Sequence, residues 1–78
     1  MRVLFFAQLR EAAGVAHAEI DGGGLDAEKL WDKLVECWPG LKVHRSETRL
    51  ARNGAYAGAG EIFATDDEVA LIPPVSGG

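Results

Sequence analysis

A single amphipathic stretch at residues 27–38 most constrains how this 78-residue chain can fold. Apolar side chains recur there at the spacing of one helix face, at Ala27, Leu30, Trp31, Leu34 and Trp38. Asp26 is placed to cap the first turn, and Pro39-Gly40 ends the pattern. A chain of this length forms one small domain, so the apolar helix face must be buried against other elements of the same domain.

Five short runs rich in apolar, β-branched and aromatic residues predict strands around this helix. These runs are residues 1–9, 15–20, 48–52, 55–57 and 68–72. The short connection at residues 10–14 predicts antiparallel pairing of the first two strands. Asn53-Gly54 is a strong signal for a type I′ hairpin. Residues 41–47 are either a linker or a short helical turn.

The predicted order of elements, strand-strand-helix-strand-strand-strand, indicates the α+β class. It is the layout of the β-grasp, or ubiquitin-like, fold. We therefore expect a mixed sheet of about five strands with one main helix packed on one face. In this layout the first and last strands lie side by side and run parallel.

Both faces of the predicted sheet carry apolar side chains, although one helix can cover only one of them. Side chains alternate between the two faces along a strand. The residues that we assign to the helix-facing side are Val3, Phe5, Val69 and Leu71. This assignment leaves Phe6 and Ile72 on the other face, and an exposed apolar surface of that kind favours a docking partner. Coverage by the chain's own residues 41–47 is the alternative.

Charge and cysteine content argue against several classes of protein. The net charge of −4 disfavours binding to nucleic acids or anionic membranes. The apolar run at residues 3–7 is too short to span a membrane or to form the core of a signal peptide. The single cysteine, Cys37, allows no disulfide within the chain, which fits a reducing cytoplasm. We therefore expect a cytoplasmic protein.

No catalytic or metal-binding constellation stands out in the sequence. His17, His44 and Cys37 lack the spacing of zinc ligands, so we expect no metal site, and the sequence assigns these three residues no role beyond structure. The acidic run at residues 66–68 is interpreted as a solvated turn, and the glycine-rich turns match no phosphate loop. No serine, cysteine or lysine has a base at a recognisable spacing. The chain is expected to be non-catalytic by itself and to bind no cofactor.

Pro73-Pro74 separates the last predicted strand from a thin tail. Proline fixes φ and removes the backbone donor, so sheet pairing is expected to stop there. We divide the chain into a domain at residues 1–73 and a tail at residues 74–78. The five residues after Pro73 reach roughly 16–18 Å when extended, and Gly77-Gly78 keeps the end narrow. Such a tail fits the active-site channel of another protein, and fraying of an ordinary terminus is the alternative.

Three segments resemble the small subunit of molybdopterin synthase. They are the opening Val3-Leu4-Phe5-Phe6-Ala7-Gln8-Leu9-Arg10-Glu11, the hairpin Arg52-Asn53-Gly54-Ala55-Tyr56 and the closing Asp67-Glu68-Val69-Ala70-Leu71-Ile72-Pro73-Pro74-Val75-Ser76-Gly77-Gly78. The Gly-Gly ending is a weak signal by itself, and it becomes strong when joined to the Phe-Phe-Ala-Gln-Leu-Arg-Glu opening and the Pro-Pro-Val-Ser approach. The resemblance covers essentially the whole chain and is to a family of ubiquitin-like sulfur carriers.

The resemblance implies that the Gly78 carboxylate is the reactive group. An adenylating enzyme would use ATP to activate this carboxylate, and a sulfur donor would displace AMP to leave a thiocarboxylate. Inside the large subunit the sulfur would pass to cyclic pyranopterin monophosphate. The other tail residues that would insert there are Pro74, Val75, Ser76 and Gly77. Phe6 and Ile72 match positions where the family is apolar at the subunit contact.

The partners implied by the resemblance are the large subunit, the adenylating enzyme and a sulfur donor. The expected assembly is a heterotetramer of two large and two small subunits, with ATP used by the activating enzyme. A sulfur carrier for thiamine or for a thiolated nucleotide is one alternative, although the opening run argues against thiamine. A protein modifier joined through Gly78 to a lysine is another. The last is an interaction module with an inert tail.

Overall fold

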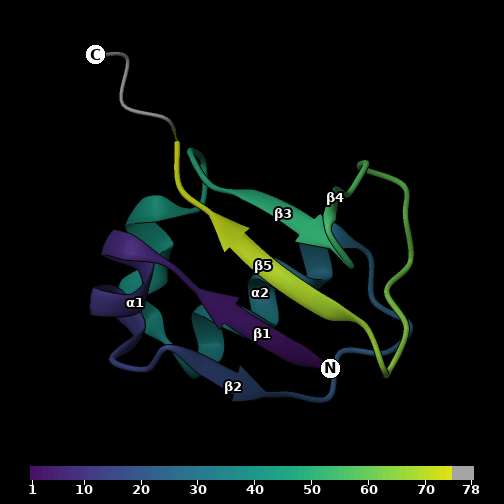
Figure 1. Ribbon diagram of the computed structural model, residues 1–78, viewed down its shortest axis with the longest axis horizontal. Helices are drawn as coiled ribbons and strands as arrows, with labels where there is room; N and C mark the ends of the chain where they lie inside the picture. The colour runs from purple at the N-terminus through teal and green to yellow at the C-terminus, as the bar shows by residue number, and fades with distance from the viewer. Residues whose placement is uncertain (75–78) are drawn as a thin grey trace.

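The computed structural model describes residues 1–74, and the predictions made for Val75, Ser76, Gly77 and Gly78 lie outside the described residues. Five strands form one mixed sheet in the order β2-β1-β5-β3-β4 (Figure 1). The strands are β1 (Arg2–Phe5), β2 (His17–Glu19), β3 (Arg49–Arg52), β4 (Ala55–Tyr56) and β5 (Glu68–Ile72). β1 and β5 are parallel neighbours, and the other pairs are antiparallel. The predicted β-grasp layout is confirmed.

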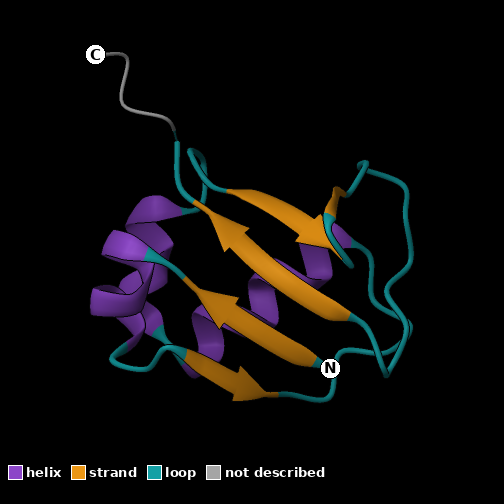
Figure 2. Ribbon diagram, in the orientation of Figure 1, coloured by secondary structure: helices purple, strands orange, loops and turns teal. Residues whose placement is uncertain are grey.

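The main helix, α2 (Ala27–Cys37), crosses one face of the sheet and lies behind the strands in Figure 2. The Asp26 carboxylate caps this helix by accepting a hydrogen bond from the Lys29 backbone N–H at 2.9 Å. Leu30, Trp31 and Leu34 are buried, as their helical spacing predicted. The helix therefore uses its one apolar face to cover one side of the sheet.

The alternation of side chains along β1 and β5 decides which residues enter the core. The parallel register places Val3 opposite Val69 and Phe5 opposite Leu71. All four side chains are at most 2% exposed, so the predicted assignment to the helix-facing side is confirmed. Full burial of a side chain of this size contributes about 1.5–3 kcal/mol. These two pairs hold the centre of the sheet against the helical layer.

A second helix, α1 (Ala7–Ala13), occupies the segment for which the sequence predicted the end of a strand and a short connection. That prediction was wrong beyond Phe5. Residues 7–13 are Ala-Gln-Leu-Arg-Glu-Ala-Ala, all good helix formers and none β-branched. Leu9 is fully buried, and Gly14 ends the helix in a left-handed conformation with φ 80°. Local propensity and one buried leucine thus favour the helix over a longer strand.

A 3₁₀ helix, η1 (Pro39–His44), shows that residues 41–47 begin with a helical turn. This turn packs against α1 and α2, and its Leu41 is fully buried in the core. Trp38, just before it, meets Phe5 edge to face with ring centroids 5.0 Å apart. Because Phe5 points to the helix side of the sheet, this segment does not cover the opposite face, and that alternative is wrong.

Candidate functional site

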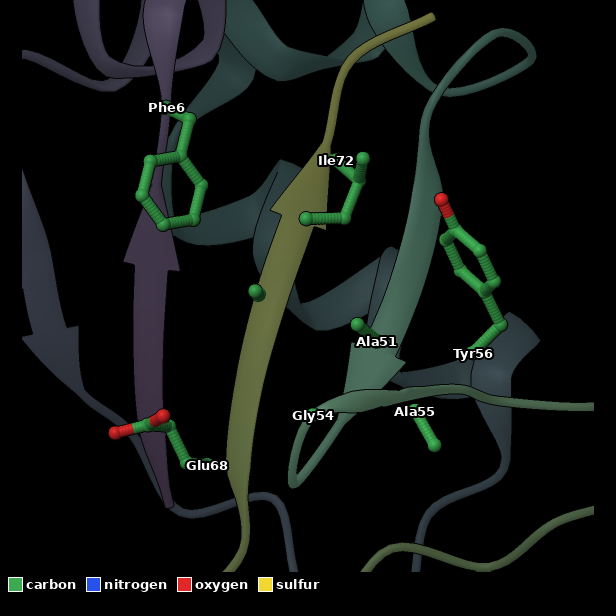
Figure 3. A pocket seen from close by; sticks show the side chains of 8 residues that line it. Phe6, Ala51, Gly54, Ala55, Tyr56, Glu68 and Ile72 are labelled. Atoms are coloured by element: carbon green, nitrogen blue, oxygen red, sulfur yellow. The ribbon is translucent and has the colours of Figure 1, made fainter.

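The sheet face that points away from α2 carries an apolar groove, and we call this side of the sheet the open face. The groove is lined by Phe6, Ala51, Gly54, Ala55, Tyr56, Glu68, Ala70 and Ile72 (Figure 3). Phe6 is 46% exposed and Tyr56 is 56% exposed. A continuous apolar surface with exposed aromatic rings is typical of an interaction site. The open face is therefore the candidate functional surface of the domain.

Phe6 and Ile72, the two predicted interface residues, lie together at one end of the open face. Phe5 pairs with Leu71, so the residues that follow them in the chain, Phe6 and Ile72, lie side by side. In Figure 3 the Ile72 side chain lies between Phe6 and Tyr56. The structure thus places both residues on the uncovered face, as expected, and their contact with a partner stays a prediction.

Tyr56 and Arg49 belong to the same end of the open face, and the sequence interpretation gave neither a role. The hairpin register places Tyr56 opposite Ala51, so Arg49 is its diagonal neighbour across β3 and β4. The Arg49 guanidinium stands over the Tyr56 ring at 3.9 Å from its centroid, the geometry of a cation–π contact. The sequence signal that could have revealed this proximity is the side-chain alternation along residues 49–52 combined with the Asn53-Gly54 turn.

The opposite end of the open face is charged. Arg2 lies between Glu19 on β2 and Glu68 on β5 in the sheet register, and all three residues are exposed. Two carboxylates flank one guanidinium there, and the Met1 ammonium lies 3.7 Å from the Glu19 carboxylate, so cations and carboxylates balance at this end. The open face therefore has an apolar end with a cation, Arg49, and a charged end whose charges are already paired.

The tail begins at the apolar end of the open face. β5 pairs with β1 and β3 through Leu71 and Ile72, and the strand ends at the two prolines. Pro73 and Pro74 lie outside any strand, as proline chemistry predicted. β5 is the central strand of the sheet, so its neighbours β1 and β3 together fix the direction in which the chain leaves the domain. Of the predicted insertion residues only Pro74 is described, and it is exposed.

Asp67 corrects the interpretation of residues 66–68 as a solvated turn. Its carboxylate is buried and accepts hydrogen bonds from the Ala64 backbone N–H at 2.7 Å, the Asn53 amide at 2.9 Å and Arg52 Nε at 2.7 Å. These donors, the Ala64 N–H and the Asn53 amide above all, lower the pKa of Asp67 below its ordinary value. The sequence places three acidic residues in a row and gives no sign that the middle one turns inward.

Asn53 joins the β3–β4 hairpin to the start of β5. Asn53 and Gly54 both have positive φ, 50° and 88°, as a type I′ turn requires. The Asn53 backbone N–H donates to the Glu68 carbonyl at 2.8 Å, and its side-chain oxygen accepts from the Glu68 N–H at 2.9 Å. Together with Asp67, these bonds fix the register of β5 at the end opposite the tail.

The remaining polar residues that the sequence drew attention to are not brought together. Residues 1–74 contain no cluster of three histidine, cysteine or acidic side chains that is able to hold a metal ion. His17 lies on β2, His44 ends η1, and Cys37 is an exposed thiol at the end of α2. No helix in this described part of the chain is long and apolar enough to cross a membrane.

Comparison with known proteins gives a match over nearly the whole chain. The model of the ThiS family matches residues 3–78. The molybdopterin synthase sulfur carrier subunit of Arabidopsis thaliana is 39% identical over 79 residues, which cover 100% of this chain and 82% of the plant protein. The protein of the same name from Homo sapiens is 33% identical over 82 residues, which cover 100% of this chain and 93% of the human protein.

A modifier protein is similar to this chain at a comparable level of sequence identity. Small archaeal modifier protein 1 from Haloferax volcanii is 37% identical over 83 residues, covering 94% of this chain and 94% of that protein. Its crystal structure matches with a TM-score of 0.78 at 35% identity, covering 99% of this chain and 97% of the archaeal chain. A sulfur carrier subunit and a modifier protein thus share this fold with the chain.

Proposed function

This chain belongs to the ThiS family, and from that premise we propose that it is the sulfur carrier subunit of a molybdopterin synthase. The single observation that carries the proposal is the full-length similarity to sulfur carrier subunits of that synthase, at 39% and 33% identity. These relatives are named as subunits, so the carrier acts together with a large subunit. The open face supplies a docking surface, and the tail that leaves beside it supplies the delivering arm.

The reactive group in this proposal is the carboxyl group of Gly78. A carboxylate is a poor electrophile until one of its oxygens becomes a good leaving group, so the activation comes from outside the chain. The Gly78 oxygen attacks the α-phosphorus of ATP and releases pyrophosphate, which leaves an acyl-adenylate. Sulfide supplied by a sulfur donor then attacks the carbonyl carbon, the bond to the phosphate oxygen breaks, AMP departs with the electron pair, and loss of the sulfur-bound proton leaves a thiocarboxylate.

The proposed delivery step uses the tail as an arm of limited reach. Residues 74–78 insert into the large subunit and present the thiocarboxylate sulfur to cyclic pyranopterin monophosphate. Two such transfers build the dithiolene of molybdopterin. A side chain at position 77 or 78 would crowd both the activating and the accepting site, which supports glycine at both positions.

The proposed assembly follows from these two steps. The open face, with Phe6 and Ile72 at its apolar end, docks on the large subunit, and two copies of each subunit form a heterotetramer. The activating enzyme binds the ATP, and the carrier itself holds no cofactor. In this proposal the chain is the substrate of one enzyme and the sulfur-donating subunit of another.

The decisive experiment measures the intact mass of the full chain before and after activation. Incubation with ATP, the adenylating enzyme and a sulfur donor is expected to raise the mass by about 16 Da, the exchange of one oxygen for sulfur. The loaded chain, mixed with the large subunit and the pterin precursor, is then expected to return to its original mass as molybdopterin forms. A matched incubation without ATP is the control. A chain that keeps its original mass throughout contradicts the proposal.

A second candidate function is protein modification, and the likeness to small archaeal modifier protein 1 favours it. In this case a lysine amine attacks the activated Gly78 carbonyl and forms an isopeptide bond. The two functions share the activation step and differ in its product. Conjugates of higher mass on a denaturing gel, formed with ATP and the activating enzyme in a lysate of the source cells, would support modification. Thiocarboxylate without conjugates supports the carrier alone.

A further inference from the structure

Arg49 is the cation at the tail end of the open face. It lies opposite Ile72, the last residue of β5, in the β3–β5 register. Its guanidinium stands over the Tyr56 ring at 3.9 Å, and the residue is exposed. Within residues 1–74 no carboxylate forms an ion pair with Arg49. The guanidinium is therefore held by an aromatic ring, and it has no acidic partner among residues 1–74.

Docking on the open face changes the surroundings of this guanidinium. The nearby Phe6, Ile72 and Tyr56 are apolar, so a partner that buries them also removes water from Arg49. Removing water from a guanidinium without supplying new hydrogen-bond acceptors has a large cost in free energy. The planar guanidinium binds a carboxylate through two parallel N–H···O hydrogen bonds. Arginines that are buried in an interface often contribute a large part of its binding free energy.

We propose that Arg49 pairs with a carboxylate of the large subunit and thereby sets the orientation of the docked partner. This inference rests on the proposed function. The charge pattern of the open face supports this occupant, because Arg49 has no carboxylate partner within residues 1–74, whereas at the opposite end Arg2 stands between Glu19 and Glu68 and Glu19 also pairs with the Met1 ammonium. A partner with its carboxylate at the tail end fits in one orientation, since the reversed orientation places that carboxylate beside Glu19 and Glu68, where the cations already have acidic neighbours. Arg49 is thus the specificity-determining residue that aligns the tail with its channel.

The test compares two exposed cations on different parts of the domain. Arg49→Gln removes the cation at the tail end of the open face, and Lys42→Gln removes one from η1, which packs against α1 and α2. The affinity of each variant for the purified large subunit is measured by calorimetry, and urea unfolding checks that both fold. Arg49→Gln is expected to bind at least about 30-fold more weakly than the wild type, and Lys42→Gln within about threefold. Equal losses for the two variants, or a loss below about threefold for Arg49→Gln, overturn the inference.

The salt dependence separates a direct contact from attraction at a distance. A desolvated pair is screened far less than exposed charges, so the difference between Arg49→Gln and the wild type is expected to persist at about 0.5 M salt. A difference that disappears at that salt concentration overturns the inference. The outcomes also distinguish the two proposals. A wild-type chain that does not bind the large subunit contradicts the proposed function, whereas normal wild-type binding with an unaffected Arg49→Gln contradicts only the role of Arg49.

Discussion

The adjacent residues Phe5 and Phe6 provide the sharpest test of the two-faced sheet. Phe5 is 2% exposed between the sheet and the helices, and Phe6 is 46% exposed on the open face. Phe5→Ala leaves a cavity in the core and is expected to cost about 3–5 kcal/mol of unfolding free energy. Phe6→Ala leaves no enclosed cavity, so its cost to the fold is expected to be about 1 kcal/mol or less.

The same change at Phe6 is expected to act mainly on docking. A phenylalanine buries about 200 Å², so the exposed part of Phe6 offers about 90 Å² to a partner. At about 25 cal/mol per Å², its burial is worth about 2 kcal/mol, which corresponds to about 30-fold in affinity. Urea unfolding followed by the fluorescence of Trp31 and Trp38 gives the stability, and titration with the large subunit gives the affinity. Phe6→Ala with normal affinity, or with a loss of stability as large as that of Phe5→Ala, refutes the reasoning.

Three further predictions concern the core, the buried carboxylate and the tail. Leu9→Ala should cost about 2–5 kcal/mol in urea unfolding, and the exposed neighbour Gln8→Ala in the same helix should be nearly neutral; equal effects contradict the burial of Leu9. Asp67 has a lowered pKa in the folded state, so its contribution to stability is present above its ordinary pKa of 3.8 and is lost as the pH falls through the lowered value. Asp67→Asn should therefore be less stable than the wild type near neutral pH in urea unfolding, with a difference that narrows below about pH 4, and a constant difference would count against this role. Deleting Gly78 should abolish thiocarboxylate formation in the intact-mass assay while the unfolding midpoint stays unchanged, and normal loading of the shortened chain would place the reactive carboxyl elsewhere.

The sequence was sufficient for the parts of the fold that follow from strong local patterns. The spacing of Leu30, Trp31 and Leu34 predicted the main helix and its buried face. The alternation in β1 and β5 predicted which side chains enter the core, because each strand position has only two possible directions. The Asn53-Gly54 turn predicted the hairpin, since few residues tolerate positive φ at two successive positions.

The features that the sequence did not reveal depend on contacts between distant segments. Helix α1 was mistaken for the end of a strand and a short connection. Its seven residues are good helix formers, but the contact that completes the case for a helix, the burial of Leu9, is present only in the folded chain. The burial of Asp67 depends on donors from Arg52, Asn53 and Ala64, which only the folded chain brings together. The Asn53-Gly54 turn fixes the register of β3 and β4, but the stacking of the Arg49 guanidinium on the Tyr56 ring is a choice of side-chain conformation that no sequence pattern specifies.

The position of β5 explains how a small domain can hold a delivering arm steady. The strand is paired with β1 up to Leu71 on one side and with β3 up to Ile72 on the other, and its start is fixed by the bonds of Asn53 and Asp67. An arm attached to an edge strand would be held by one neighbour only, and pulling on it would separate a single ladder of hydrogen bonds. Here the strand that carries the arm also contributes Val69 and Leu71 to the core and Ile72 to the open face. A single alternating strand therefore connects the core, the open face and the start of the tail at Pro74.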